Sequence, residues 1–181
     1  SVIKQDTSHL IYPSHLKYEE SRKMPYLALI DQLNRFIRKK SSFLILSGYS
    51  FNDGHLNDTI INALKANPTA MVLGLMHDRY EKNSGDDSPV ERYPVAYRLA
   101  ENQHNLNIWT FDKAIIGTNL GRWNKVKNKE DDDSDLLKFI CRDKQNDGCE
   151  NGEDLIKLGD FSVFTDFLKK IIGTSKKDKN V

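Results

Sequence analysis

Hydrophobic positions in the first part of the chain follow a helical spacing twice, with a compact apolar run between. A segment that starts at Pro25 and ends in basic residues predicts a helix, because proline fits the first helical turn and cations the last. Residues 43–46 form the apolar run and predict a buried strand, and the second periodic segment ends at Asn67 and Pro68. The apolar positions of the two predicted helices are Leu27, Ile30, Leu33 (or Asn34) and Ile37, and Leu56, Ile60, Ile61 and Leu64.

Strand and helix signals keep alternating in the residues that follow. Residues 70–76 predict a second buried strand, residues 80–89 a polar loop, residues 90–102 a helix and residues 106–111 a third strand. Two short strands without polar alternation, joined by a crossover long enough for a helix, are typical of a right-handed parallel βαβ unit covered on both faces. The sequence therefore predicts an α/β fold around a parallel sheet.

The last third of the chain changes character. Residues 124–153 contain a basic run followed by an acidic run, which predicts a mobile polar insertion with one helix near residues 136–141. Order returns at residues 155–158, and Asp160 is expected to cap a helix whose phenylalanines share one apolar face. The charged end after Gly173 predicts a disordered tail.

The charges of the chain nearly cancel, since 27 Lys and Arg face 26 Asp and Glu among 181 residues. We therefore expect no direct nucleic-acid binding and no attraction to an anionic membrane. Hydrophobic residues make up 38% of the chain, which is enough for a packed core and excludes global disorder. No apolar run approaches the roughly 18 residues of a membrane span, so the sequence predicts a cytoplasmic protein.

The cysteines bear on metal binding, and the first residue bears on whether the chain is part of a longer protein. Cys141 and Cys149 lack the spacing that completes a tetrahedral metal site, so we expect reduced thiols and no metal. The chain begins at Ser1 without an initiator methionine, so we expect that a further segment precedes it.

The segment from Phe43 to Asn57 carries the strongest candidate chemistry, because a strand, a glycine turn and a helix start follow one another. Gly48 lets a ligand approach the backbone closely, and the free amides of the following helix favour a phosphate. Ser50 is able to donate to a phosphate or ribose hydroxyl, and Asn52 or Asp53 to cap the helix or accept from a ribose. The alternative interpretation is an ordinary turn glycine and an ordinary helix cap.

Several of these residues belong to motifs of one family. The stretch His9-Leu-Ile-Tyr-Pro-Ser-His-Leu-Lys17-Tyr18, the Met24-Pro-Tyr26 that opens a helix, and Gly48-Tyr-Ser-Phe-Asn-Asp-Gly-His-Leu-Asn57 occur in this order. Together they resemble the second half of bacterial sirtuin-like proteins, the branch linked to NAD hydrolysis in phage defence. The resemblance covers residues 10–117, and Leu158-Gly-Asp-Phe161 with the helix that follows resembles the family's last strand and helix. Its most specific part is Gly-Tyr-Ser-Phe-x-Asp-x-His-x-Asn.

The resemblance implies a Rossmann-like parallel sheet with helices on both faces and a bound NAD. Gly48 and Ser50 would face the ribose and phosphates. The residues near the adenosine end would be Met76, His77, Asp160 and Phe161. His55 would either orient the turn or contact the ligand. The implied NAD-binding residues are Gly48, Tyr49, Ser50, Phe51, Asp53, His55, Met76, His77, Asp160 and Phe161.

The chain departs from the family in one respect. The family's glycine-rich phosphate loop, catalytic Asn and catalytic His all precede the matching segment, and residues 1–181 contain no counterpart. We therefore expect only the second half of a larger sirtuin-like domain, with no catalytic residue in this chain. Residues 1–123 and 155–173 would form that half, interrupted by the insertion at 124–154 and followed by the tail at 174–181.

The resemblance further implies that the parent protein hydrolyses NAD to nicotinamide and ADP-ribose, in antiphage defence by NAD depletion. Because NAD depletion is toxic, we expect control by homo-oligomerisation or by a regulatory protein partner. One alternative is an NAD-dependent protein deacylase, although two cysteines do not build the four-cysteine zinc module common in those enzymes. The other is a non-catalytic module that senses NAD or ADP-ribose or docks a partner.

Overall fold

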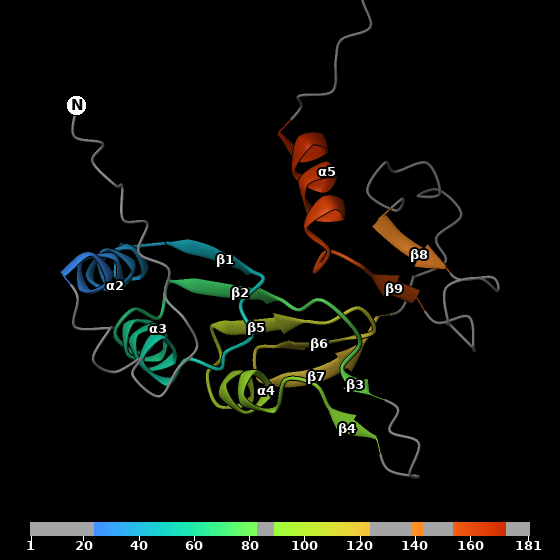
Figure 1. Ribbon diagram of the computed structural model, residues 1–181, viewed down its shortest axis with the longest axis horizontal. Helices are drawn as coiled ribbons and strands as arrows, with labels where there is room; N and C mark the ends of the chain where they lie inside the picture. Colours follow the sequence, from blue (N-terminus) through green and yellow to red (C-terminus); the bar gives the residue numbers. More distant parts are fainter. Residues whose placement is uncertain (1–23, 83–88, 124–138, 143–153, 173–181) are drawn as a thin grey trace, which may run out of the picture.

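A mixed five-stranded sheet forms the centre of the computed structural model (Figure 1), which describes residues 24–82, 89–123, 139–142 and 154–172. The strand order is β1 (Phe43–Ser47), β2 (Met71–Leu75), β5 (Leu106–Trp109), β6 (Lys113–Ile116) and β7 (Asn119–Arg122). The first three strands run parallel, whereas β6 and β7 are antiparallel. The predicted α/β class is confirmed, and the sheet that was predicted to be parallel is parallel in β1, β2 and β5 and mixed as a whole.

A tight hairpin accounts for the antiparallel part of the sheet. Gly117 and Thr118 join β6 to β7, and both have positive φ angles, 56° and 74°. Two consecutive residues with positive φ are typical of the type I′ turn, whose twist matches that of two paired strands. The third strand therefore continues into a hairpin instead of another crossover helix.

In the described part of the chain, four helices pack around the sheet. They are α2 (Met24–Ile37), α3 (Gly54–Ala66), α4 (Pro94–Glu101) and α5 (Phe161–Ile171). The helix predicted at residues 90–102 starts only at Pro94, because proline suits a first helical position and disfavours helical backbone at the residue before it. Residues Val90–Glu91 instead form β4, which pairs with β3 (Glu81–Lys82) inside the predicted polar loop.

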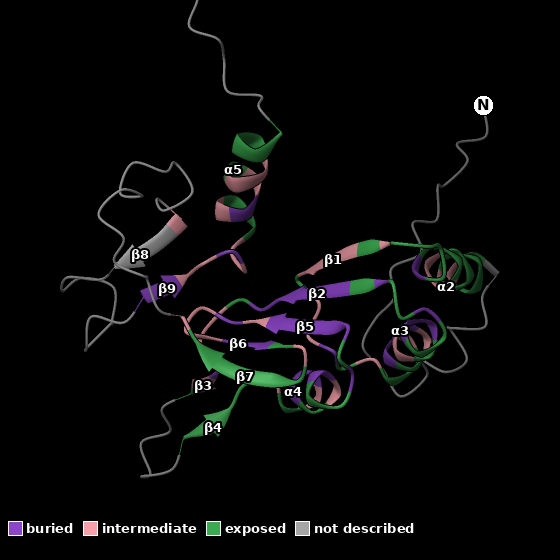
Figure 2. Ribbon diagram, turned by 180° about the vertical axis from the view of Figure 1, so that it is seen from behind, coloured by how far each residue is buried: buried purple, intermediate pink, exposed green. Residues whose placement is uncertain are grey.

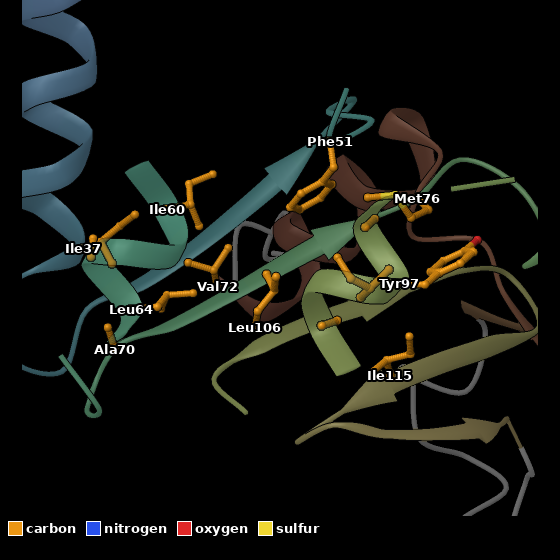
Figure 3. Packing of buried hydrophobic residues seen from close by; sticks show 14 of the residues in the cluster. Ile37, Phe51, Ile60, Leu64, Ala70, Val72, Met76, Tyr97, Leu106 and Ile115 are labelled. Atoms are coloured by element: carbon orange, nitrogen blue, oxygen red, sulfur yellow. The ribbon is translucent and has the colours of Figure 1, made fainter. Parts of the chain in front are cut away.

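The two faces of the sheet have separate cores, as the alternation along β2 shows. Val72 and Met76 belong to the larger core, which includes residues from α3 and α4 (Figure 3). Leu73 and Leu75 belong to a second core with Leu158 and side chains of α5. Helices therefore cover both faces, and Figure 1 shows α5 well apart from α3 and α4. Figure 2 shows that β2 and β5 are the most buried strands.

The carboxyl-terminal part does not extend the central sheet. Strands β8 (Ile140–Arg142) and β9 (Asp154–Ile156) pair with each other in a two-stranded antiparallel sheet. The helix predicted near residues 136–141 is therefore wrong for Ile140 and Cys141, and residues 136–138 lie outside the described part. The N–H of Ile156 donates to the carbonyl of Phe111 at 2.8 Å, which attaches β9 beside the end of β5.

Three predicted regions lie wholly or mostly outside the described residues. They are the amino-terminal motif between His9 and Tyr18, the insertion at 124–154 and the tail at 174–181. Within the described ranges, every helix is too short or too polar to cross a bilayer.

Two buried tyrosines predict a loss of stability at alkaline pH. Tyr80 and Tyr97 stack at 4.1 Å between ring centroids, and the hydroxyl of Tyr97 donates to the carbonyl of Tyr80. Burial, reinforced by nearby acidic groups and by other tyrosines, raises the pKa of both phenols above the ordinary value of 10.0. The folded state therefore retains protons that the unfolded chain loses, and this contribution to stability is complete below pH 10 and declines above it.

We expect the free energy of unfolding, measured with urea between pH 8 and pH 11, to fall more steeply above pH 10. The variant Tyr97→Phe removes one of the two groups, so its slope above pH 10 should be shallower by up to about 1.4 kcal/mol per pH unit. Parallel curves for the two proteins would contradict this origin of the alkaline loss.

Candidate functional site

The loops that follow β1, β2 and β5 meet at one edge of the sheet. Ser47 pairs with Leu75, and Leu75 with Trp109, so the three parallel strands end level with one another. The segment Leu158–Phe161 joins them from the far end of the chain, and Figure 1 shows α5 beyond the arrowheads of β1 and β2. In open α/β sheets, ligands bind outside the carboxyl ends of the strands.

The loop after β1 presents backbone donors to this edge. Gly48 has a φ of 74°, a conformation that glycine adopts without steric cost. The N–H groups of residues 49–54 make no hydrogen bond to any described residue, and the same holds for the Ser50 hydroxyl. Gly48 is exposed and Ser50 is half-buried. A ligand with acceptor oxygens would find several donors here on a short stretch of backbone.

Asn57 holds this loop in shape. Its Nδ2 donates to the carbonyl of Phe51 at 2.8 Å, and its Oδ1 lies 2.8 Å from the Tyr49 hydroxyl. Asn57 is buried, and Phe51 has a φ of 59° that is uncommon for a bulky residue. Asn57 is the last residue of the Gly-Tyr-Ser-Phe pattern, yet it was not among the predicted site residues. Its role is to position the loop.

Asp53 is the N-cap of α3. Its Oδ1 accepts from the N–H groups of His55 and Leu56, at 3.1 and 3.2 Å, and the hydroxyl of Tyr26 lies 3.4 Å from Oδ2. Two of the helix amides that the sequence offered to a phosphate are therefore occupied by Asp53. Burial and then the Asp53 carboxylate raise the pKa values of Tyr26 and Tyr49, which keeps both phenols protonated as donors. The donors left for a ligand belong to the loop and to Gly54, the first residue of α3.

The loop after β2 contains two of the predicted NAD-binding residues, Met76, which is buried, and His77, which is exposed. The Met76 side chain packs in the larger core, so only its backbone faces the edge. His77 is exposed, and its ring meets the ring of Phe111 edge-on at 5.5 Å. The Tyr93 hydroxyl donates to the carbonyl of His77 at 2.9 Å, which fixes the backbone at this point.

Asp78, the next residue, holds an unusual backbone conformation with a φ of 138°. Arg92 pairs with its carboxylate at 3.0 Å, and the Phe111 N–H donates to its carbonyl at 2.9 Å. A strained backbone conformation persists only where several contacts hold it in place, and such conformations are frequent at functional sites. The sequence carried no signal for it.

The segment before α5 packs directly against the loop after β2. A Cβ atom at Gly159 would overlap the carbonyl group of Met76 and lie 2.9 Å from the nitrogen of His77. Asp160 then caps α5, its Oδ1 accepting from the N–H groups of Ser162 and Val163. Phe161 is 67% exposed at the start of that helix. The structure thus brings the segment that contains Asp160 and Phe161 beside the loop that contains His77.

The predicted residues divide by what their side chains do. The side chains of Phe51 and Met76 are buried in the core and support the loops, so these two residues offer only their backbone to a ligand. Ser50, His77 and Phe161 present accessible groups, whereas Asp53, Asp160 and Tyr49 are engaged within the protein. His55 is exposed at the first turn of α3. No group of three potential metal ligands converges in the part of the chain that the structure describes.

Comparison with known proteins adds no family to this picture. No protein-family model matches the chain, and no curated protein matches it.

Proposed function

We propose that this chain is the NAD-binding half of a sirtuin-like protein that hydrolyses NAD to nicotinamide and ADP-ribose, in antiphage defence by NAD depletion. The observation that most supports the proposal is a row of N–H groups at residues 49–54 that bond to no described residue, beside the Ser50 hydroxyl, which has no described partner either. It lies at the carboxyl end of a parallel strand, where α/β proteins bind the phosphates of dinucleotides through backbone amides.

The proposed contacts use neutral donors for a doubly charged pyrophosphate. Residues 48–53 contain no Lys or Arg, so the phosphate oxygens would accept from loop N–H groups and from Ser50. The exposed rings of His77 and Phe161 offer stacking surfaces for the adenine beside the end of β2. These residues would thus hold the ADP part of NAD and leave the nicotinamide ribose to the other half of the domain.

In hydrolysis, the bond between C1′ of the ribose and the nicotinamide nitrogen breaks and its electron pair leaves with neutral nicotinamide. Water adds its hydroxyl to C1′, and its remaining proton is released. This chain contributes by fixing the ribose and phosphates, because correct placement of the sugar lowers the barrier to attack. The resemblance assigns the Asn and His that act on the sugar to a preceding segment. A deacylase and a non-catalytic sensor remain outcomes of the tests below.

Backbone amide NMR during titration with NAD and with ADP-ribose tests the binding part of the proposal, and it detects millimolar dissociation constants. We expect shifts at residues 49–54, His77 and Phe161. The variant Ser50→Ala should raise the Kd about tenfold, because loss of one hydrogen bond to a charged phosphate costs roughly 1.5 kcal/mol. Ser42→Ala, at the other end of the β1 segment, serves as the matched control with unchanged Kd. An unchanged Kd in Ser50→Ala, or shifts elsewhere, would reject the site.

Nicotinamide release from the longer polypeptide tests the reaction. Release without any peptide supports hydrolysis, whereas strict dependence on an acyl-lysine peptide would assign a deacylase. Binding without turnover under conditions that promote assembly would assign a sensor.

A further inference from the structure

Asp78 occupies a backbone conformation that favours glycine, shortly after the end of β2. Its φ of 138° is one that side chains rarely adopt, so a glycine would form the same turn with less strain. The Asp78 side chain makes two contacts that glycine lacks. Its Oδ1 accepts from the N–H of Arg79 at 2.7 Å, and its Oδ2 pairs with the guanidinium of Arg92 at 3.0 Å. The reason for an acid at this position therefore lies in its carboxylate.

The Asp78 carboxylate is accessible and is able to accept further hydrogen bonds. An ionised carboxylate has about four lone-pair positions, and the contacts with Arg79 and Arg92 use one on each oxygen. The side chain of Asp78 is 37% exposed, and that of Arg92 is 32% exposed. Two adjacent hydroxyl groups on a ligand would therefore find an acceptor oxygen each. The vicinal diol of a ribose is such a pair of donors.

The position of Asp78 along the sheet edge fits the ribose that carries the adenine. Strands β1 and β2 end level with each other at Ser47 and Leu75, and neighbouring strands lie about 4.8 Å apart. The Phe111 N–H donates to the Asp78 carbonyl at 2.9 Å, which places Asp78 between the ends of β2 and β5. A dinucleotide whose phosphates bind the loop after β1 would therefore bring its adenosine ribose beside Asp78, next to the exposed ring of His77.

We propose that Asp78 accepts hydrogen bonds from the two hydroxyls of the adenosine ribose and thereby selects NAD over NADP. This inference rests on the proposed function and names the residue that sets its substrate class. In NADP a phosphate replaces the 2′-hydroxyl, so one donor is lost and a like charge meets the carboxylate. The guanidinium of Arg92 would attract that phosphate, but its pairing with Asp78 offsets part of its charge. The pair therefore favours the unphosphorylated ribose.

NMR titration with ADP-ribose and with its 2′-phosphate tests the proposal. We expect the unaltered protein to bind ADP-ribose more tightly than the 2′-phosphate by about tenfold, the effect of a hydrogen bond to a charged group. In Asp78→Asn, ADP-ribose should bind more weakly and the 2′-phosphate more tightly, because Arg92 is released to pair with phosphate. Asp58→Asn removes the same charge from an exposed residue of α3 and should leave the preference unchanged.

A second variant, Asp78→Gly, separates a ligand contact from a purely structural role. Glycine adopts a φ of 138° without strain, so this variant should stay folded with a melting temperature close to that of the unaltered protein. It should nevertheless lose the preference for ADP-ribose. An unchanged preference in either folded Asp78 variant, or tighter binding of the 2′-phosphate by the unaltered protein, would overturn the role of Asp78 and leave the proposed site intact. Binding of neither nucleotide by the unaltered protein would reject the proposed function together with this inference.

Discussion

Replacement of Gly159 by alanine is expected to destabilise the fold by about 3 kcal/mol, at the upper end of the cost of overpacking. A Cβ atom at this position overlaps the Met76 carbonyl group and lies 2.9 Å from the His77 nitrogen. Because these neighbours are backbone and not the ends of flexible side chains, no rotamer change relieves the overlap. The segment around Gly159 must therefore move away from the end of β2.

That movement would disturb the second core. Leu158, next to Gly159, packs with Phe164 of α5 and with Leu73 and Leu75 of β2. A displacement of Leu158 opens this cluster, so the loss of stability should be concentrated in α5. Under the proposed function, the same shift separates Phe161 from His77 and weakens ADP-ribose binding.

Urea denaturation followed by circular dichroism measures the stability of Gly159→Ala, and hydrogen exchange locates the effect. Gly121→Ala is the matched control, since a Cβ at Gly121 meets nothing within 4 Å and should change stability by less than about 0.5 kcal/mol. Equal stability of the two variants would show that the close approach of Gly159 to Met76 does not exist.

The elements that the sequence predicted well are those with a local pattern. Short-range periodicity and the prolines and glycines that end helices and strands predict three elements. They are the helix that starts near Pro25, the strand at residues 43–46 and the helix that ends at Asn67. The β6–β7 hairpin was missed although Gly117 and Thr118 mark its turn, because its four-residue strands carry too little alternation to stand out.

The candidate site shows the same division between local and tertiary information. Asp53 as a helix cap and Gly48 as a turn residue follow from neighbouring sequence, and the structure places both in these positions. Three other features depend on contacts between separate elements. They are the burial of Phe51, the hydrogen bonds by which Asn57 holds the loop, and the approach of Gly159 to Met76. Residue spacing carries no information about such contacts, so the sequence assigned Phe51 to the ligand and omitted Asn57.

Phe51 and Phe161 provide a matched test of this distinction, because the sequence assigned both to NAD. Phe51 is 1% exposed, meets the Tyr49 ring at 4.7 Å between centroids and lies against Gly74 and Met76 (Figure 3). Phe51→Ala should therefore lower the free energy of unfolding by about 4 kcal/mol, through lost burial and the cavity left behind. Phe161 is 67% exposed, so Phe161→Ala should cost less than about 0.5 kcal/mol.

Thermal and urea unfolding of both variants measure these differences, and Phe51→Leu should recover most of the loss because leucine fills much of the same volume. Binding of ADP-ribose should give the opposite order. Phe161→Ala, still folded, should lose the affinity that stacking on an exposed ring supplies, whereas Phe51→Leu should keep it as long as Asn57 holds the loop. Equal stability of Phe51→Ala and Phe161→Ala would refute the core position of Phe51, and intact ADP-ribose affinity in Phe161→Ala would remove that ring from the proposed site.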